Sequence, residues 1–433
     1  MKNKIVFLLL VLISTNYSLL FGSNVQLDSI QLLIKNYKYG QALKIIDKEL
    51  EQKNDFKILY YYKGNVLREM YSYNKAIDSY LKAFSLDSTD NLIVINLALT
   101  YKNIQDYNNA IHYFSKGLVQ DSTNQYLSIE IANCKFLNKQ FDQALKDFIK
   151  LYQKDSTNYF VITRLAYCFN KFSLYDSAVY YFGKACVLNP NDFNNLKSFC
   201  VASIAKKDYK SGIKRTELFI SKDSNNFEIN TMNSYLYLLD KQYRQSIQKA
   251  TNCVNRGFSS IDIYKYLGIA YYRLKAFDTA KIYLEKVYHM DTLDVNNLEF
   301  LSNACLNSYY KELGIFYLEK YIELSGYDIE RYAQVYQKLY EACVMTWSKC
   351  PLEKQLSVSL KSYQLNPDNY GILYTIGYCY DVGKKDSKNA IGFYSKYLSE
   401  KKKYEKNVVY LNGSVNLDEQ IEERIKELKK STK

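Results

Sequence analysis

The sequence predicts an all-α protein, an α-solenoid built from repeated pairs of antiparallel helices. Two observations lead to this fold class. Small residues recur at a spacing of 34 residues or its multiples, and apolar residues between them recur at steps of three and four, as on one buried face of a helix. A fixed period of this length is typical of a helical repeat array. The small residues are Ala42, Ala76, Ala110, Ala144, Ala178, Gly212, Ser246, Ala280 and Gly314.

The first 23 residues have the layout of a secretory signal peptide. Lys2 and Lys4 give a positive start, Ile5–Ile13 is an apolar run, and Gly22-Ser23 follow a polar stretch. We therefore expect residues 1–23 to be removed and the chain to be exported to the periplasm or the outer envelope. The first cysteine is Cys134, so a lipoprotein anchor is not expected. No later stretch is apolar enough to span a membrane.

Residues 24–404 are predicted to form the repeat array. In the unit Lys57–Asp90, an apolar helix is followed by a polar break and then by a second helix near the small residue. Short polar stretches such as Asp155-Ser156-Thr157-Asn158 end the units, and their side-chain oxygens are good caps for the next helix. The predicted units start near Asn24, Lys57, Asn91, Gln125, Tyr159, Phe193, Phe227, Ile261, Val295, Tyr336 and Tyr370.

The repeat register slips at about residues 329–354. Cys343–Lys354, which holds Trp347, fits the repeat least well and is expected to be an enlarged turn or a distorted repeat. After the array, residues 405–433 are predicted to form a loop and a C-terminal capping helix, Leu417–Lys430. Such a polar cap closes the exposed face of the last repeat.

The pattern resembles the tetratricopeptide repeat family, in its exported bacterial form. The resemblance covers about 380 residues and rests on two sets of positions in addition to the spacing of small residues. The family's small residue near the end of the first helix matches Gly64, Ala98, Ala132, Ala166 and Gly268. Its aromatic residue in the second helix matches Tyr80, Phe114, Phe148, Phe182 and Tyr394. This resemblance implies a right-handed superhelix of about eleven units, whose first helices line an inner groove.

The resemblance also implies which residues face a partner. The positions are Tyr61, Asn65, Arg68, Lys102, Asn133, Tyr167 and Asn170. We expect a non-enzymatic scaffold or assembly factor of the bacterial cell envelope that binds another protein or peptide there. The alternative is an envelope protein that binds glycan or peptidoglycan, because many of the 46 tyrosines should lie on helix surfaces, where they can stack on sugars.

Composition favours binding over catalysis. No cofactor, catalytic or metal-binding motif occurs, and His112 and His289 are far apart in the chain. The net charge of +13 comes from lysines scattered among acidic residues, so nucleic acid is not an expected partner. Most of the nine cysteines fall on core positions and are interpreted as packing residues. Cys343 and Cys350 are the one pair expected to form a disulfide. The sequence leaves the oligomeric state open.

Overall fold

The computed structural model describes residues 26–52, 54–325, 329–346, 350–404 and 417–431. All regular structure within these residues is helical, as the sequence predicts. The chain divides after Lys206 into two compact units, which are described here one at a time. The signal segment 1–23 and residues 405–416 of the predicted C-terminal loop lie outside the described residues.

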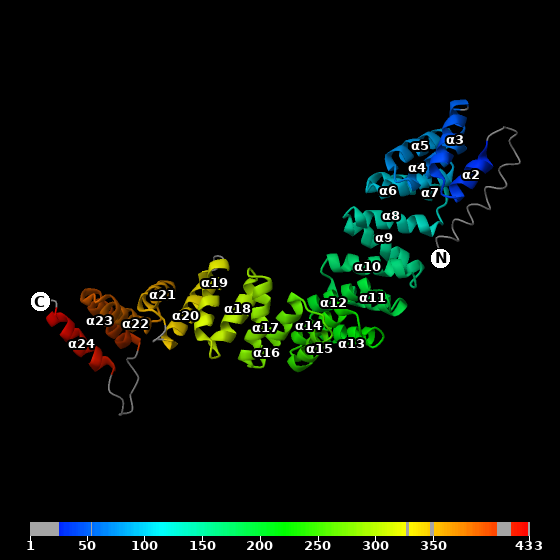
Figure 1. Ribbon diagram of the computed structural model, residues 1–433. Helices are drawn as coiled ribbons and strands as arrows, with labels where there is room; N and C mark the ends of the chain where they lie inside the picture. Colours follow the sequence, from blue (N-terminus) through cyan, green and yellow to red (C-terminus); the bar gives the residue numbers. More distant parts are fainter. Residues whose placement is uncertain (1–25, 53, 326–328, 347–349, 405–416, 432–433) are drawn as a thin grey trace. The chain divides into compact units, whose positions relative to one another are not determined.

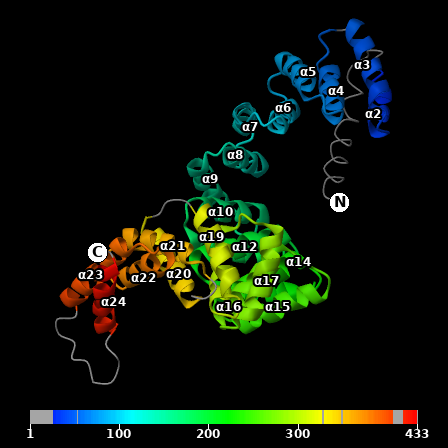
Figure 2. The same cartoon turned by 60° about the vertical axis from the view of Figure 1, so that its left-hand side comes forward.

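In the first unit each helix packs against the helix before it and the helix after it (Figures 1 and 2). The helices are α2 (Leu27–Lys35), α3 (Tyr39–Gln52), α4 (Lys57–Glu69), α5 (Tyr73–Leu86), α6 (Asn91–Asn103), α7 (Tyr107–Gln120), α8 (Gln125–Leu137), α9 (Phe141–Lys154), α10 (Tyr159–Lys171), α11 (Tyr175–Leu188) and α12 (Phe193–Lys206).

The second unit continues the same pattern as far as α19 and then becomes less regular, with a long helix and a π-helical turn. Its elements are α13 (Tyr209–Ile220), α14 (Phe227–Leu239), α15 (Tyr243–Asn255), α16 (Ile261–Arg273), α17 (Phe277–Met290), α18 (Val295–Leu306), α19 (Lys311–Leu324), α20 (Ile329–Met345), α21 (Leu352–Leu365), α22 (Ile372–Tyr378), η1 (Cys379–Lys384), α23 (Ser387–Tyr404) and α24 (Leu417–Ser431).

The polar ends of the repeats fix where each first helix begins. Asn158 caps α10, because its side-chain oxygen accepts a hydrogen bond from the backbone N–H of Val161 at 3.1 Å. The cap satisfies one of the N–H groups that the first turn of a helix leaves without a partner. Equivalent caps open α6, α8, α14 and α18 at Asp90, Asn124, Asn226 and Asp294.

The turn between the two helices of a pair uses one residue in the left-handed region. Its φ is near +60°, although the residue is never glycine at this place in the repeat. Side chains with a Cβ are strained in that region, so the helix packing on both sides must hold the turn. These residues lie 34 positions apart and are Tyr37, Tyr71, Gln105, Lys139, Ser173, Lys207, Lys241 and Lys275.

The small residues of the repeat mark close contacts between the paired helices. A Cβ atom on Gly64 would lie 2.5 Å from the ring of Tyr80, so no larger side chain fits there without movement. Four residues after the small residue of the second helix, an aromatic ring fills the space between helices. In the first unit Phe114, Phe148 and Phe182 occupy this place and are fully buried.

The equivalent place in α13 is polar. Thr216 is fully buried, and its hydroxyl donates to the Gly212 carbonyl at 2.9 Å and accepts from the Asn233 amide at 2.8 Å. In the next pair, Ser234 and Ser246 replace the two small residues. Each hydroxyl donates to the carbonyl of the other residue, at 3.0 and 2.9 Å. Helices α13–α15 therefore share a hydrogen-bonded core.

Helix α24 covers the end of the second unit. Ile421, Ile425 and Leu428 are buried in one cluster with side chains of α22 and α23. The guanidinium of Arg424 also donates to both carboxylate oxygens of Asp381, each at 2.9 Å. Asp381 is almost fully buried, so this paired contact stabilises a charge that would otherwise be unfavourable there.

Candidate functional site

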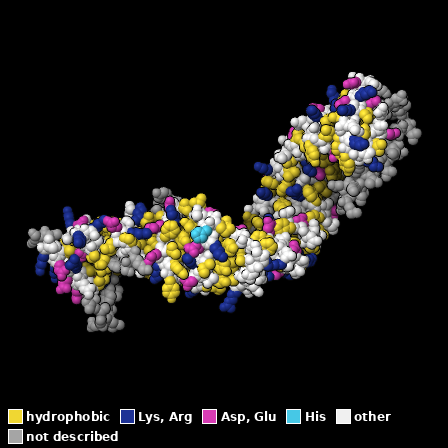
Figure 3. Space-filling model, in the orientation of Figure 1, with side chains coloured by type: hydrophobic (Ala, Val, Ile, Leu, Met, Phe, Trp, Pro, Cys, Tyr) yellow, Lys and Arg dark blue, Asp and Glu magenta, His cyan; other side chains and the backbone are white. Residues whose placement is uncertain are grey.

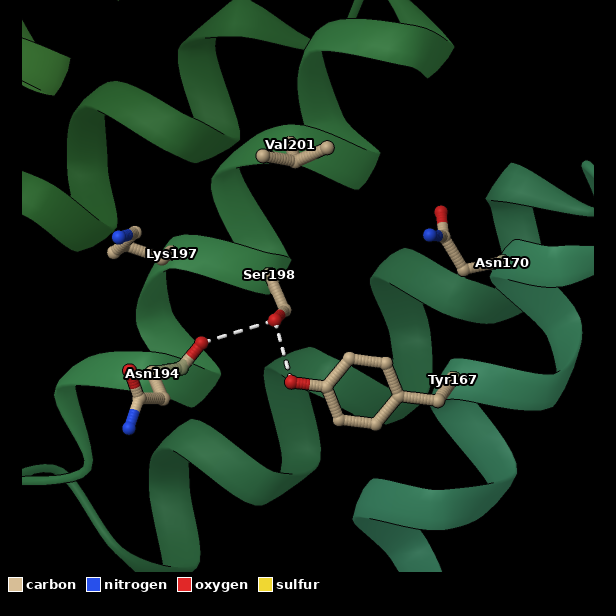
Figure 4. A pocket seen from close by; sticks show the side chains of 6 residues that line it. All are labelled: Tyr167, Asn170, Asn194, Lys197, Ser198 and Val201. Atoms are coloured by element: carbon tan, nitrogen blue, oxygen red, sulfur yellow. Dashed lines mark hydrogen bonds between the residues drawn. The ribbon is translucent and has the colours of Figure 1, made fainter. Parts of the chain in front are cut away.

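A cleft of about 470 Å³ opens between α10 and α12 of the first unit (Figure 4). Helix α10 contributes two residues at a spacing of three, and α12 contributes four at spacings of three and four, so each set lies on one helix face. The lining residues are Tyr167, Asn170, Asn194, Lys197, Ser198 and Val201. Both helices are first helices of their pairs, which is where the sequence places the binding groove.

One wall of the cleft is fixed by a short chain of hydrogen bonds. The Tyr167 hydroxyl lies 2.7 Å from the Ser198 hydroxyl, and Ser198 donates to the backbone carbonyl of Asn194 at 2.9 Å. The ring of Tyr167 meets Phe182 edge to face, with centroids 5.0 Å apart. The ring is thus held at both ends, and the wall needs little ordering when a ligand arrives.

Two amide side chains in the cleft have no internal partner. Among the described residues, the structure gives no hydrogen bond to the side chain of Asn170 or Asn194. Each amide offers donors and an acceptor, and an exposed amide can pair with water or with a ligand. Lys197 extends along the ring of Phe193, with its Nζ 5.3 Å from the ring centroid. The apolar side of the cleft is Val201, which is 51% exposed.

The same groove positions in the preceding repeats are occupied by contacts within the chain. Lys102 of α6 forms an ion pair with Glu130 of α8 at 2.6 Å. Arg68 of α4 donates to the Asn96 side chain of α6, and that amide lies 3.4 Å from the Tyr61 hydroxyl. Their polar groups are already paired, so a ligand would have to compete with these contacts.

The seven predicted groove residues therefore fall into three groups. Tyr167 and Asn170 line the cleft. Tyr61, Arg68 and Lys102 pair with other groove residues, and the Asn65 carbonyl oxygen accepts from the Tyr80 hydroxyl at 2.6 Å. Asn133 is only 4% exposed, so the expectation that its side chain faces the groove is corrected. Its helix turns this position toward the interior, beside the buried Ala132 and Cys134.

The sequence analysis missed the four cleft residues on α12. Continuing the repeat would have found two of them, because Lys197 and Val201 lie 34 residues after Thr163 and Tyr167. The pairing of Ser198 with Tyr167 has no signal in the sequence, since it depends on side-chain directions across two helices.

Cys343 and Cys350 are both buried and are free thiols in the structure. A side-chain hydrogen bond joins them, and burial together with this bond raises the pKa of Cys343. The two cysteines are therefore close enough to touch, and their disulfide stays a prediction. Trp347, between them, lies outside the described residues. The other cysteines are buried too, and burial raises the pKa of Cys134 to about 11 and of Cys168 to about 12, as expected for packing residues.

Charged side chains of both signs are interspersed on the face shown in Figure 3. Within the described residues no group of His, Cys, Asp and Glu is arranged to hold a metal ion. No helix there combines the length and apolar character needed to cross a bilayer.

The fold and the cleft define a class of protein, the α-solenoids made of stacked helix pairs. A family model described as tetratricopeptide repeat matches residues 93–121, which span α6 and α7. Helix pairs with the same spacing precede and follow this match. The chain therefore belongs to the tetratricopeptide repeat family.

No curated protein matches the chain. Among solved structures, a tetratricopeptide repeat protein from Parabacteroides merdae shares 12% identity, with a TM-score of 0.40, and covers 57% of this chain and 98% of its own. The C-terminal part of a repeat protein from Cytophaga hutchinsonii shares 16%, with a TM-score of 0.44, covering 63% and 98%. YrrB, described as a repeat protein with an unusual peptide-binding site, shares 17%, with a TM-score of 0.36, covering 42% and 95%. The family assignment rests on the repeat match and the helix spacing, not on these values.

Proposed function

We propose that the chain is a non-enzymatic scaffold or assembly factor that binds a segment of another protein in the cleft between α10 and α12. The observation that carries the proposal is the contrast within the groove. The amides of Asn170 and Asn194 have no hydrogen bond in the described part of the chain, whereas groove residues such as Lys102 and Glu130 are paired with each other.

An extended peptide suits this cleft. Its backbone presents N–H and C=O groups, and an asparagine amide can donate to one and accept from the other. Asn170 and Asn194 lie on different helices, so together they can hold a strand of peptide at two points. The rigid wall of Tyr167 and Ser198 reduces the ordering cost, and Val201 offers an apolar contact.

A location in the bacterial cell envelope is part of the proposal. It is supported by the charged start and apolar run of residues 1–23. N-terminal sequencing of the chain taken from its cell envelope should give a start near residue 23 or 24. Retention of Met1 would contradict this location.

The test of binding combines capture and mutation. The chain is used to capture proteins from envelope extract, and a captured protein is purified and titrated against the double variant Asn170→Ala with Asn194→Ala. Loss of two neutral hydrogen bonds should weaken binding by about tenfold or more. Asn74→Ala is the matched control, because Asn74 is an exposed asparagine on α5, outside the cleft, and its change should leave the affinity unaltered.

Two outcomes count against the proposal. Equal affinity of the wild type and the double variant would exclude the cleft as the binding site. Retention of the chain on peptidoglycan or polysaccharide, with no protein captured, would favour the glycan alternative. Of the tyrosines expected to be surface platforms for sugars, Tyr235 stacks on Tyr266, and the Tyr340 hydroxyl bonds to Thr375.

A further inference from the structure

Arg164 of α10 lies between two phenylalanine rings. Its guanidinium carbon is 4.9 Å from the ring centroid of Phe136 on α8 and 5.1 Å from that of Phe160 on its own helix. Both distances are within the range of cation–π contacts. The rings fix the position of the side chain and remove much of it from water.

The guanidinium has no polar partner in the part of the chain that the structure describes. Neither an ion pair nor a hydrogen bond to Arg164 is present there, although the group carries five N–H donors. The nearby carboxylate of Glu130 is directed to Lys102, 2.6 Å away. Residues at the same place in the neighbouring repeats do have polar partners, since Asn96 pairs with Arg68, and Ser198 pairs with Tyr167.

A half-buried cation without an anion is electrostatically unfavourable. Burial lowers the pKa of Arg164, while Tyr167, Cys168 and Glu130 partly oppose the shift. An arginine stays protonated in proteins even so, and the charge therefore persists at this site. An anion that approaches between the rings would meet the charge in a medium of lower polarity than water, which strengthens the attraction.

Arg164 is continuous with the cleft. The Phe136 ring that stacks on Arg164 also contacts the ring of Tyr167, with centroids 6.4 Å apart. Tyr167 in turn lines the cleft (Figure 4). A peptide held by Asn170 and Asn194 could therefore extend along this aromatic surface to Arg164.

We propose that Arg164 binds a carboxylate group of the partner peptide, supplied by an acidic side chain or by the peptide's C-terminus. The inference rests on the proposed function. The planar guanidinium can form two parallel hydrogen bonds with a carboxylate, and the two rings hold its plane in place. The partner segment is thus acidic close to the portion that occupies the cleft.

The experiment uses the full chain and a random peptide library on beads. Selection on the wild type should enrich Asp and Glu, and selection on Arg164→Ala should not. The best peptide is then synthesised with Glu replaced by Gln, and with a free or an amidated C-terminus. The form that lacks the essential carboxylate should bind about tenfold more weakly or worse, and this identifies the source of the group. Its residual affinity should match that of Arg164→Ala for the original peptide.

Two further variants separate carboxylate binding from folding. Arg164→Lys keeps the charge but loses the paired hydrogen bonds, so it should bind the acidic peptide more weakly than the wild type and more tightly than Arg164→Ala. Arg244→Ala, at an exposed arginine of α15, should bind like the wild type. If the selected peptides bind equally well without any carboxylate, the inference fails while the proposed function stands. If no peptide is enriched at all, both fail.

Discussion

Helices α6–α11 and helices α13–α15 have the same spacing and fill it with different chemistry. The first set buries Phe114, Phe148 and Phe182 between its pairs, and the second buries Thr216 at the equivalent place. Burial of an aromatic side chain contributes more free energy than one internal hydrogen bond. The comparison teaches that the repeat fixes the backbone, whereas the side chains set the local stability of each repeat. In a solenoid these local stabilities need not be equal.

The largest expected effect comes from breaking the aromatic side of the comparison. Phe148→Ala should lower the free energy of unfolding by about 3–5 kcal/mol, because a fully buried ring leaves a cavity. Hydrogen exchange should accelerate first in α8–α10, which pack around this ring. Thr216→Ala should cost about 1–3 kcal/mol, since it leaves the Asn233 amide without its acceptor. Equal losses in the two variants would refute the difference between the regions.

A smaller effect should sharpen the polar side. Thr216→Val alone removes the acceptor of the Asn233 amide and should destabilise by about 1–3 kcal/mol. Adding Asn233→Leu should restore the lost stability or exceed it, because the side-chain oxygen of Asn233 is buried with no hydrogen-bond partner among the described residues. Chemical denaturation of both variants measures the coupling. Additive losses in the double variant would show that the polar pair does not act as a unit.

The smallest effect concerns the polar turns, which both regions share. Hydrogen bonds from Lys57, and then from Thr89, lower the pKa of Asp87 to about 2. A lowered carboxyl pKa stabilises the fold above the unfolded value near 4, and this contribution is lost as the pH falls from about 4 to about 2. The pair is partly exposed, so Lys57→Met should cost under about 1 kcal/mol at neutral pH and reduce the loss of stability in acid. Thermal unfolding at several pH values measures this, and an unchanged acid profile would contradict it.

The sequence predicted the helix pairs closely, because a 34-residue period constrains every repeat at once. The first helices α4, α6, α8 and α10 begin at the predicted unit starts Lys57, Asn91, Gln125 and Tyr159. Past α19 the repeated constraint is lost. Helix α20 is 17 residues long and begins at Ile329, ahead of the expected Tyr336, and the π-helical turn η1 had no sequence signal.

The site was harder to predict than the fold. Spacing alone identified Tyr167 and Asn170, but it gave the same weight to Lys102 and Asn133. Whether a groove residue is available depends on its partner about one repeat away, and that pairing follows from rotamers and not from the period. Arg164 was missed for the same reason, because the two rings that hold it come from different helices.

The left-handed turn residues give this chain a graded route to greater heat resistance. Lysine at such a turn, as at Lys139 or Lys207, carries strain that asparagine largely avoids, so each replacement should recover up to about 1 kcal/mol. Sites one repeat apart share few contacts, and their gains should add. A protein engineer could therefore raise the melting temperature in steps, one turn at a time, without changing the cleft between α10 and α12.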